Sequence, residues 1–306
     1  MKPTLFLVSD SPRPNLALAK MAAAFQDEYV VEFAPSMDWA FAARKPFDDN
    51  YIFASWIFKR EKGADWEGGP ASLDPWYELP EHIEKVYPDF SHWSEMENRT
   101  MGYLTRGCPR RCPWCCVPDN EGAVTRQVAE VNDIWRGERQ LEIMDANLLA
   151  LPKRRTLCLL GDLAATKAQI DFTQGLDCRL IDDEIAAALA RVRVKTYRIS
   201  CDTDAVLPFA EVAMRRLWAA KRTANITCYV FVDWRNHDWL ENAMRRIDHL
   251  AAVDFDVNYE ADGVHRFIPF IMLWDKDNAP LQARHLQRWC NRPAIYRSIP
   301  FSEYNP

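Results

Sequence analysis

Several features are missing from this chain of 306 residues, and each absence excludes a class of protein. No apolar run approaches the roughly 18 residues that a membrane-spanning helix needs, so we expect no membrane partner. The formal net charge of −6 provides no overall field that would attract nucleic acid. The first residues carry neither the long apolar segment nor the cleavage site of a secretory signal, so we expect a cytoplasmic protein.

Metal ligands are also scarce outside one segment. The six histidines show no ligand spacing, and five of the nine cysteines stand alone in predicted strands or helices: Cys158, Cys178, Cys201, Cys228 and Cys290. In a reducing compartment cysteines are thiols or metal ligands before they are disulfides. We expect no second metal cluster, and we expect buried core thiols at Cys178 and Cys201.

What is present describes an ordinary globular chain, with 48% apolar and 27% charged residues. In the first part, strands are predicted at 4–8, 30–34 and 51–58, and a helix is predicted at 15–25. This alternation indicates a small α/β layer with parallel strands. Residues 63–82 are rich in glycine, proline and acids, which is typical of a loop. We therefore predict an N-terminal α/β domain over residues 1–95 and a second domain over 96–306.

The second domain repeats the alternation regularly. Strands are predicted to begin the segments 101–107, 141–150, 169–180, 196–203, 226–234 and 267–275. Helices are predicted at 126–135, 182–192, 208–222, 239–253 and 281–292. Six successive strand–helix units indicate an incomplete β/α barrel, in which polar residues at the carboxyl ends of the strands carry the chemistry.

Four cysteines gather in the segment "TRGCPRRCPWCCVPDNEG". Cys108, Cys112 and Cys115 are spaced CxxxCxxC, and Cys116 follows directly. Soft thiolates on a loop bind zinc or an iron–sulfur cluster. Structural zinc takes four ligands, whereas three thiolates on a four-iron cluster leave one iron open for reaction. Two hypotheses follow: a reactive iron–sulfur site and a zinc-binding interaction module.

This loop resembles the signature of the radical S-adenosylmethionine (radical SAM) superfamily, in which an aromatic residue precedes the third cysteine, as Trp114 does here. Further segments are similar to a subgroup often found in bacteriophage and bacterial genomes: "PNLALAK", "YPDFS", "IWRGE", "DANLLA", "DFTQGLDCRL" and "LQRWCNRPAIYRS". The resemblance implies a partial (β/α)6 TIM-like barrel. It also implies a 4Fe-4S cluster on Cys108, Cys112 and Cys115 that cleaves SAM to a 5′-deoxyadenosyl radical, with an external reductant of flavodoxin or ferredoxin type.

The resemblance also implies roles for residues at the early strand ends. After the second strand the superfamily has a Gly-Gly-Glu motif that holds the SAM amino group. This chain has Asp145 and Asn147 there, and a helix cap is the alternative. After the third strand, Gln174, Asp177 and Arg179 lie at the expected mouth. Arg179 could pair with the SAM carboxylate, and a structural pair with Asp177 is the alternative.

The later strands contribute the remaining candidates. Ser200 and Asp202 end the fourth strand and are expected to face the ribose or the substrate. The sixth strand, with Met272, is expected to offer backbone groups to adenine, and Asp275 follows at its end. We assign catalytic roles to Asp202 and Asp275, and cofactor binding to Ser200, Met272 and Trp114.

The N-terminal domain is similar to a degenerate, Rossmann-like relative of the domain that precedes the barrel in cobalamin-dependent members. Cobalamin binding in that class commonly uses a DxHxxG segment. The corresponding loop here is "SDSPRPN" at residues 9–15, without histidine or glycine. This difference argues against cobalamin as a cofactor.

The expectation about the substrate rests on analogy with relatives alone. The phage-associated relatives suggest an isomerase or mutase that hypermodifies thymidine in DNA, in the host cytoplasm if the protein is phage-encoded. Residues 214–222 and 284–297 mix arginine with aromatics, as nucleic-acid surfaces do, although solvated helix faces are the favoured interpretation of both stretches. The alternatives are a radical SAM enzyme acting on tRNA, a peptide or a small metabolite, and the zinc module.

Overall fold

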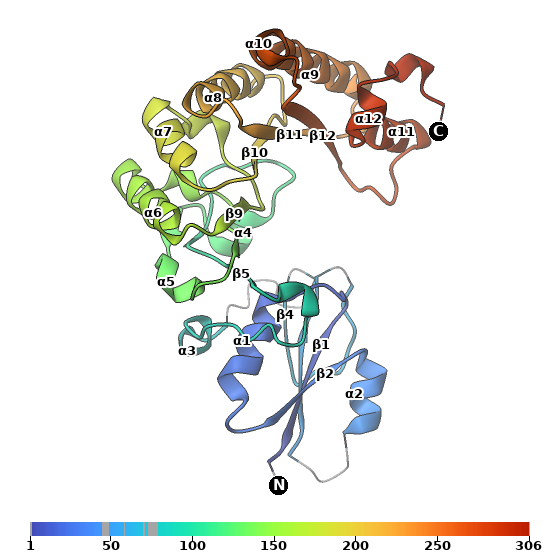
Figure 1. The fold of residues 1–306 in the computed structure, drawn as a ribbon. Helices are drawn as coiled ribbons and strands as arrows, with labels where there is room; N and C mark the ends of the chain where they lie inside the picture. Colours follow the sequence, from blue (N-terminus) through green and yellow to red (C-terminus); the bar gives the residue numbers. More distant parts are fainter. Residues whose placement is uncertain (1, 45–48, 58, 70, 73–78, 306) are drawn as a thin grey trace.

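The computed structural model describes residues 2–44, 49–57, 59–69, 71–72 and 79–305, which form two parts joined end to end (Figure 1). The N-terminal part has a four-stranded parallel sheet in the order β2-β1-β3-β4. Its strands are β1 Thr4–Ser9, β2 Val30–Ala34, β3 Tyr51–Ser55 and β4 Trp66–Gly68. Its helices are α1 Leu16–Phe25, α2 Met37–Ala43 and α3 Glu81–Glu84.

Side-chain alternation along β1 explains why helices cover both faces of this sheet. Successive side chains of a strand point to opposite faces. Leu5 and Leu7 belong to the apolar cluster that contains α1, whereas Phe6 and Val8 belong to the cluster that contains α2. Figure 1 shows α1 and α2 on opposite sides of the strands.

The C-terminal part contains six parallel strands in chain order. They are β5 Arg99–Gly102, β8 Gln140–Ile143, β9 Gln169–Phe172, β10 Thr196–Ser200, β11 Asn225–Val232 and β12 Phe267–Leu273. They form two three-stranded sheets, β5-β8-β9 and β10-β11-β12. Two parallel bridges, Ile170–Val194 and Leu176–Ile199, join the sheets. The result is one curved wall whose strand ends all point the same way.

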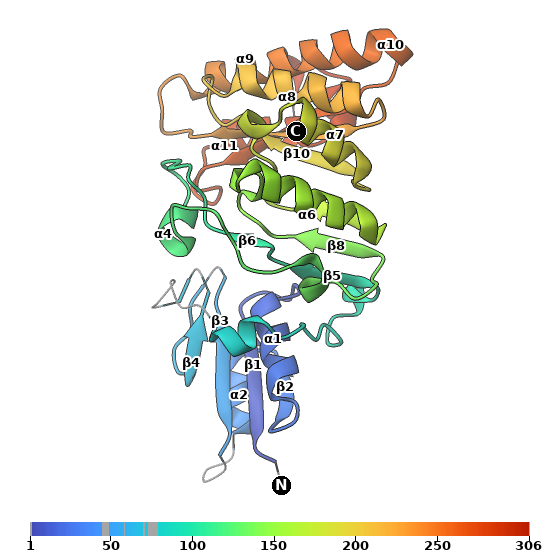
Figure 2. The ribbon, with the colours of Figure 1, turned by 90° about the vertical axis from the view of Figure 1, so that its left-hand side faces the viewer.

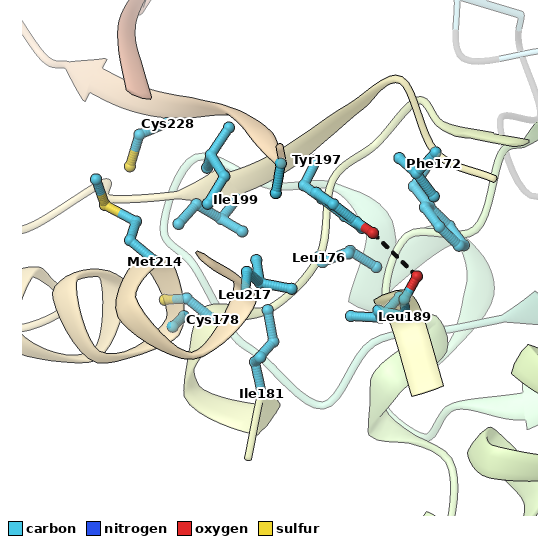
Figure 3. Close-up of a cluster of buried hydrophobic side chains, with 14 of the residues drawn as sticks. Phe172, Leu176, Cys178, Ile181, Leu189, Tyr197, Ile199, Met214, Leu217 and Cys228 are labelled. Carbon is cyan, nitrogen blue, oxygen red and sulfur yellow. Dashed lines mark hydrogen bonds between the residues drawn. The ribbon is translucent and has the colours of Figure 1, made fainter. Parts of the chain in front are cut away.

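Long helices cover the outer side of this wall (Figures 1 and 2). They are α6 Lys153–Thr166, α7 Asp183–Arg191, α8 Leu207–Ala220, α9 Trp239–Asp254 and α11 Leu281–Cys290. The core lies between helices and strands, as Figure 3 shows around Ile199, Met214 and Leu217. There the Tyr197 hydroxyl donates to the carbonyl of Leu189 at 2.9 Å, which satisfies a buried polar group.

Shorter elements complete the described chain. They are α4 Val117–Glu121, α5 Val131–Ile134, α10 Glu260–Asp262, α12 Pro293–Tyr296, β6 Thr105–Arg106 and β7 Arg126–Gln127. Single turns of 3-10 helix occur at Ser94–Met96, Leu148–Ala150, Cys178–Leu180 and Phe301–Glu303, and a π-helix at Phe255–Tyr259. Within the described residues, no helix combines the length and apolarity that crossing a bilayer requires.

The α/β class with parallel sheets is confirmed, and several predicted elements are corrected. The helix predicted at 126–135 is wrong, because Gln127 pairs antiparallel with Thr105 and only Val131–Ile134 is helical. The predicted loop 63–82 contains β4 and the start of α3, while residues 70 and 73–78 lie outside the described residues. The strand predicted at 51–58 ends at Ser55. The long helix α6 and the short helix α2 were not predicted.

Candidate functional site

The cysteine loop follows β5 and is closed at its base by backbone contacts. The amide of Cys108 donates to the carbonyl of Gly122 at 3.1 Å, and the Thr125 hydroxyl donates to the carbonyl of Gly107 at 3.1 Å. Gly107 has φ +86°, and a Cβ there would lie 2.3 Å from the carbonyl oxygen of Val124. Only glycine fits this close approach, so the base of the loop has a fixed shape.

The thiols of the loop differ in exposure. Cys108 is buried, Cys112 and Cys115 are half-buried, and Cys116 is exposed at the start of α4. Burial raises the pKa of Cys112 and of Cys115, and the neighbouring thiols raise both further. In the described part of the chain, no three His, Cys, Asp or Glu side chains converge closely enough to hold a single metal ion.

Asp145 lies at the end of β8 and holds the start of the loop. Its carboxylate accepts the backbone amide of Leu104 at 2.8 Å and the hydroxyl of Thr105 at 2.6 Å. Burial raises the pKa of Asp145 to about 7, although these hydrogen bonds oppose the shift. Both carboxylate oxygens therefore bind the chain itself, which gives Asp145 a positioning role in this structure.

Asn147 lies two residues after Asp145, is also buried, and contacts one of the cysteines. Only 3% of its surface is exposed. Its amide nitrogen lies 3.5 Å from the sulfur of Cys108 and 3.3 Å from the carboxylate of Asp177. Its amide oxygen is buried and has no hydrogen-bond partner among the described residues. A buried acceptor of this kind has a desolvation cost that a bound donor would remove.

Asp177, after β9, connects this amide to two arginines. Arg110 of the loop donates to its carboxylate at 2.7 Å, and Arg179 donates at 2.6 Å. Burial opposes ionisation of Asp177, but the hydrogen bonds from Arg179 and Arg110 outweigh it and hold its pKa below the ordinary value. The ionised carboxylate thus holds Arg110, between Cys108 and Cys112, against the strand ends.

A cavity of about 330 Å³ lies on the other side of the loop, at the carboxyl ends of β10 and β11. Trp114 stacks on Phe231 in its wall, with ring centroids 4.2 Å apart and an interplanar angle of 17°. Asp202 also lines the cavity, and burial raises its pKa to about 6 although Arg246 and Arg179 oppose the shift. This wall offers an aromatic face beside a carboxylate.

The other predicted residues lie outside this network. The carbonyl of Ser200 accepts the thiol of Cys178 at 3.4 Å. Met272 is exposed, and Asp275 lies in a turn with φ +40°, where it accepts the side-chain amide of Asn278 at 2.9 Å. Gln174 lines a separate cleft. The structure thus links Cys108 to Asn147, Asn147 to Asp177 and Asp177 to Arg179, and it places Trp114 and Asp202 in the wall of one cavity.

The separate cleft, of about 500 Å³, lies between the two parts of the molecule. An ion-pair chain runs through its wall: Lys20 contacts Glu84 at 3.1 Å, and Arg106 contacts Glu84 at 3.1 Å and Glu121 at 3.0 Å. The guanidinium of Arg106 lies 3.5 Å from the ring centroid of Tyr103. Sequence reasoning did not identify these charged residues as part of a site. A lysine on the apolar face of a predicted helix, as Lys20 is, was the available signal.

Arg246 is a further residue that sequence reasoning missed. Its guanidinium lines the cavity beside Trp114 and donates to the carbonyl of Cys201 at 3.0 Å. It lies on α9, and only 5% of its surface is exposed. A charged residue inside the apolar stripe of a predicted helix was again the only available signal.

Comparison with known proteins finds similarity among solved structures. No protein-family model matches the chain, and no curated protein matches it. The fold is similar to that of a radical S-adenosylmethionine methyltransferase, TsrM, from Kitasatospora setae, whose structure has cobalamin and a [4Fe-4S] cluster bound. The TM-score is 0.59 and the identity 13%, over 89% of this chain and 75% of that chain. At this identity the likeness establishes the shared α/β fold.

Proposed function

We propose that this chain is a radical SAM enzyme whose 4Fe-4S cluster is held by Cys108, Cys112 and Cys115. The observation that carries the proposal is the polar network that joins Cys108 to Asn147 and Asp177 at the strand ends. Three thiols beside two arginines suit an anionic cluster with one open iron. The unpaired amide oxygen of Asn147 suits an ammonium group.

The residues around the loop would then bind and orient SAM. When bound, the cluster supplies the electron that cleaves SAM to methionine and a 5′-deoxyadenosyl radical. Arg179 offers a guanidinium to the SAM carboxylate, while Asp202, with a pKa of about 6, is mostly ionised at neutral pH and accepts hydroxyl donors. The stacked Trp114 and Phe231 form the wall that excludes water on that side.

The fold supports a finer description of the architecture. We propose that the six-stranded wall is the partial β/α barrel of this superfamily, and that the four-stranded sheet is a Rossmann-like domain. We keep the predicted boundary near residue 95, although the apolar cores change a few residues later in the chain. One cluster gathers residues from Leu5 to Met101, and the large cluster begins at Leu104.

For the substrate, we propose a modified nucleotide and an isomerase or mutase reaction. The arginines of the basic stretch 214–222 argue against a long DNA footprint. Arg215 pairs with Glu211 at 3.0 Å and with Asp256 at 2.7 Å, and Arg216 pairs with Asp183 at 3.0 Å. Acidic partners thus neutralise Arg215 and Arg216, two of the four basic residues of this stretch, which favours a nucleotide-sized substrate over a duplex.

We propose further that the chain does not use cobalamin. The loop after β1 has no histidine. The Asn15 amide donates to the Ser55 hydroxyl at 2.9 Å and so joins the start of α1 to the end of β3, where a ligand would enter the sheet edge. Purified protein mixed with hydroxocobalamin and passed through a desalting column should retain no corrin absorbance. Retained absorbance at one equivalent would overturn this part of the proposal.

The main experiment is anaerobic reconstitution with iron and sulfide, followed by dithionite, SAM and an assay for 5′-deoxyadenosine. We expect a brown protein with about four irons that releases 5′-deoxyadenosine. A mutase regenerates SAM once substrate is present, whereas a consuming enzyme depletes it. A colourless protein with one zinc and no 5′-deoxyadenosine would instead identify the zinc-binding interaction module.

A further inference from the structure

Asn147 carries an inference that rests on the proposed function and goes beyond it. The amide nitrogen faces two acceptors, the sulfur of Cys108 and the carboxylate of Asp177. The opposite orientation of the amide would place its oxygen against both acceptors. The surroundings therefore fix the orientation, with the nitrogen toward the sulfur and the oxygen buried and unpaired.

The geometry points to Asn147 as a positioning residue that sets the reduction potential of the cluster through a hydrogen bond to the sulfur of Cys108. Hydrogen bonds to cluster sulfurs stabilise the electron-rich reduced state and raise the potential. The donor stays in place because Asp177, itself fixed by Arg110 and Arg179, accepts from the same amide nitrogen.

This assignment separates two neighbours that the sequence treats alike. Asp145 and Asn147 lie two residues apart and are both 3% exposed. Asp145 directs its oxygens to the backbone of Leu104 and to Thr105, so it fixes the loop base. Asn147 alone of the two contacts a cysteine sulfur. The carboxylate thus has the structural role, and the amide has the role toward the cluster.

The test compares wild-type protein, Asn147→Ala and Asn132→Ala after anaerobic reconstitution. Asn132 is an exposed asparagine on α5 and serves as the matched control. The midpoint potential of the cluster is measured without SAM by a redox titration followed by electron paramagnetic resonance. Asn147→Ala should shift the potential to more negative values, because the reduced and more electron-rich cluster loses a hydrogen bond to one of its sulfur ligands. Asn132→Ala should match the wild type.

A potential unchanged in Asn147→Ala overturns the inference. If that variant loads no cluster, Asn147→Leu replaces it, since leucine has a similar volume and no hydrogen-bond donor. An unchanged potential there has the same meaning. A wild-type protein that forms a cluster but releases no 5′-deoxyadenosine overturns the proposed function, while the potential still tests Asn147. A wild-type protein that forms no cluster overturns both.

Discussion

The two parts of the molecule each present the carboxyl ends of a parallel sheet, and these ends differ in chemistry. In the N-terminal sheet the polar groups satisfy one another. Asn15 caps α1 and contacts Ser55, and Asp10 accepts the backbone amides of Ile57 and Lys59 at 2.8 and 2.6 Å. Among the described residues of this sheet, no buried side-chain nitrogen or oxygen lacks a hydrogen-bond partner.

The strand ends of the six-stranded wall hold buried polar groups whose loss of hydration is not fully compensated. Burial raises the pKa of Asp145 and of Asp202, and the amide oxygen of Asn147 is buried without a partner among the described residues. Unsatisfied and perturbed polar groups gather where a site is built for a ligand. On the proposed function, the same topology serves structure at one edge and chemistry at the other, and four experiments can test that division.

The largest effect is expected at the cluster ligands. Cys112→Ala should reduce 5′-deoxyadenosine formation to background and lower the iron content, because two thiolates do not hold the cluster. Cys116→Ala removes the exposed neighbouring thiol and should leave both quantities unchanged. Iron analysis and chromatography of the product measure them. Equal losses in the two variants would contradict the assignment of the three ligands.

The next effect is expected at Asp177. Asp177→Ala leaves the guanidinium groups of Arg110 and Arg179 without their buried acceptor, so the loop loses its anchor to β9. We expect SAM cleavage to fall about 10- to 100-fold and the free energy of unfolding to fall by about 1–3 kcal/mol. Assays of both quantities in Asp183→Ala, which removes an exposed ion pair to Arg216, give the control. Wild-type activity in Asp177→Ala would show that the anchor is dispensable.

A smaller, pH-dependent effect is expected at Asp145. Its folded pKa of about 7 lies above the usual 3.8, so the folded state binds the proton more tightly. This contribution to stability is full below about pH 4 and is lost as the pH rises through about 7. Asp145→Asn should remove this dependence. Denaturant unfolding at pH 5 to 8 measures it, and parallel curves for both proteins would contradict the assignment.

The smallest effect on activity is expected at the N-terminal edge. Asn15→Ala removes the cap of α1 and the contact with Ser55, and it should lower the free energy of unfolding by about 1 kcal/mol. SAM cleavage per bound cluster should stay within experimental error of the wild type. A tenfold loss of cleavage at full cluster occupancy would show that this edge also serves the reaction.

Local patterns predicted much of the fold. Helices such as Asp183–Arg191 follow a capping aspartate and begin with an acidic first turn. Buried strands such as Phe267–Leu273 are visible in the sequence as apolar runs. The helix Lys153–Thr166 was not predicted, because it begins with polar residues and has no side-chain cap. Residues 126–135 were misread because the pairing of Gln127 with Thr105 joins positions far apart in the sequence.

The sequence predicts the part of the site that depends on the spacing of residues. It predicts less of the part that depends on contacts between residues far apart in the chain. The pattern of Cys108, Cys112 and Cys115 is visible in the sequence. The difference between Asp145 and Asn147 is not, because it depends on Leu104 and Thr105, about 40 residues earlier in the chain. Local propensity cannot report which of two neighbouring polar side chains turns toward a sulfur.

The closed base of the cysteine loop has a consequence for how the protein matures. Many small metal-binding domains fold only when the ion arrives, so that binding and folding are one event. Here the hydrogen bonds between Cys108 and Gly122 and between Gly107 and Thr125 close the base of the loop within the chain itself, without using a metal ligand. On the proposed function, cluster insertion is then binding to a loop whose base is already closed. Its rate should follow the concentration of the donor, and a protease should find the empty loop as resistant as the filled one.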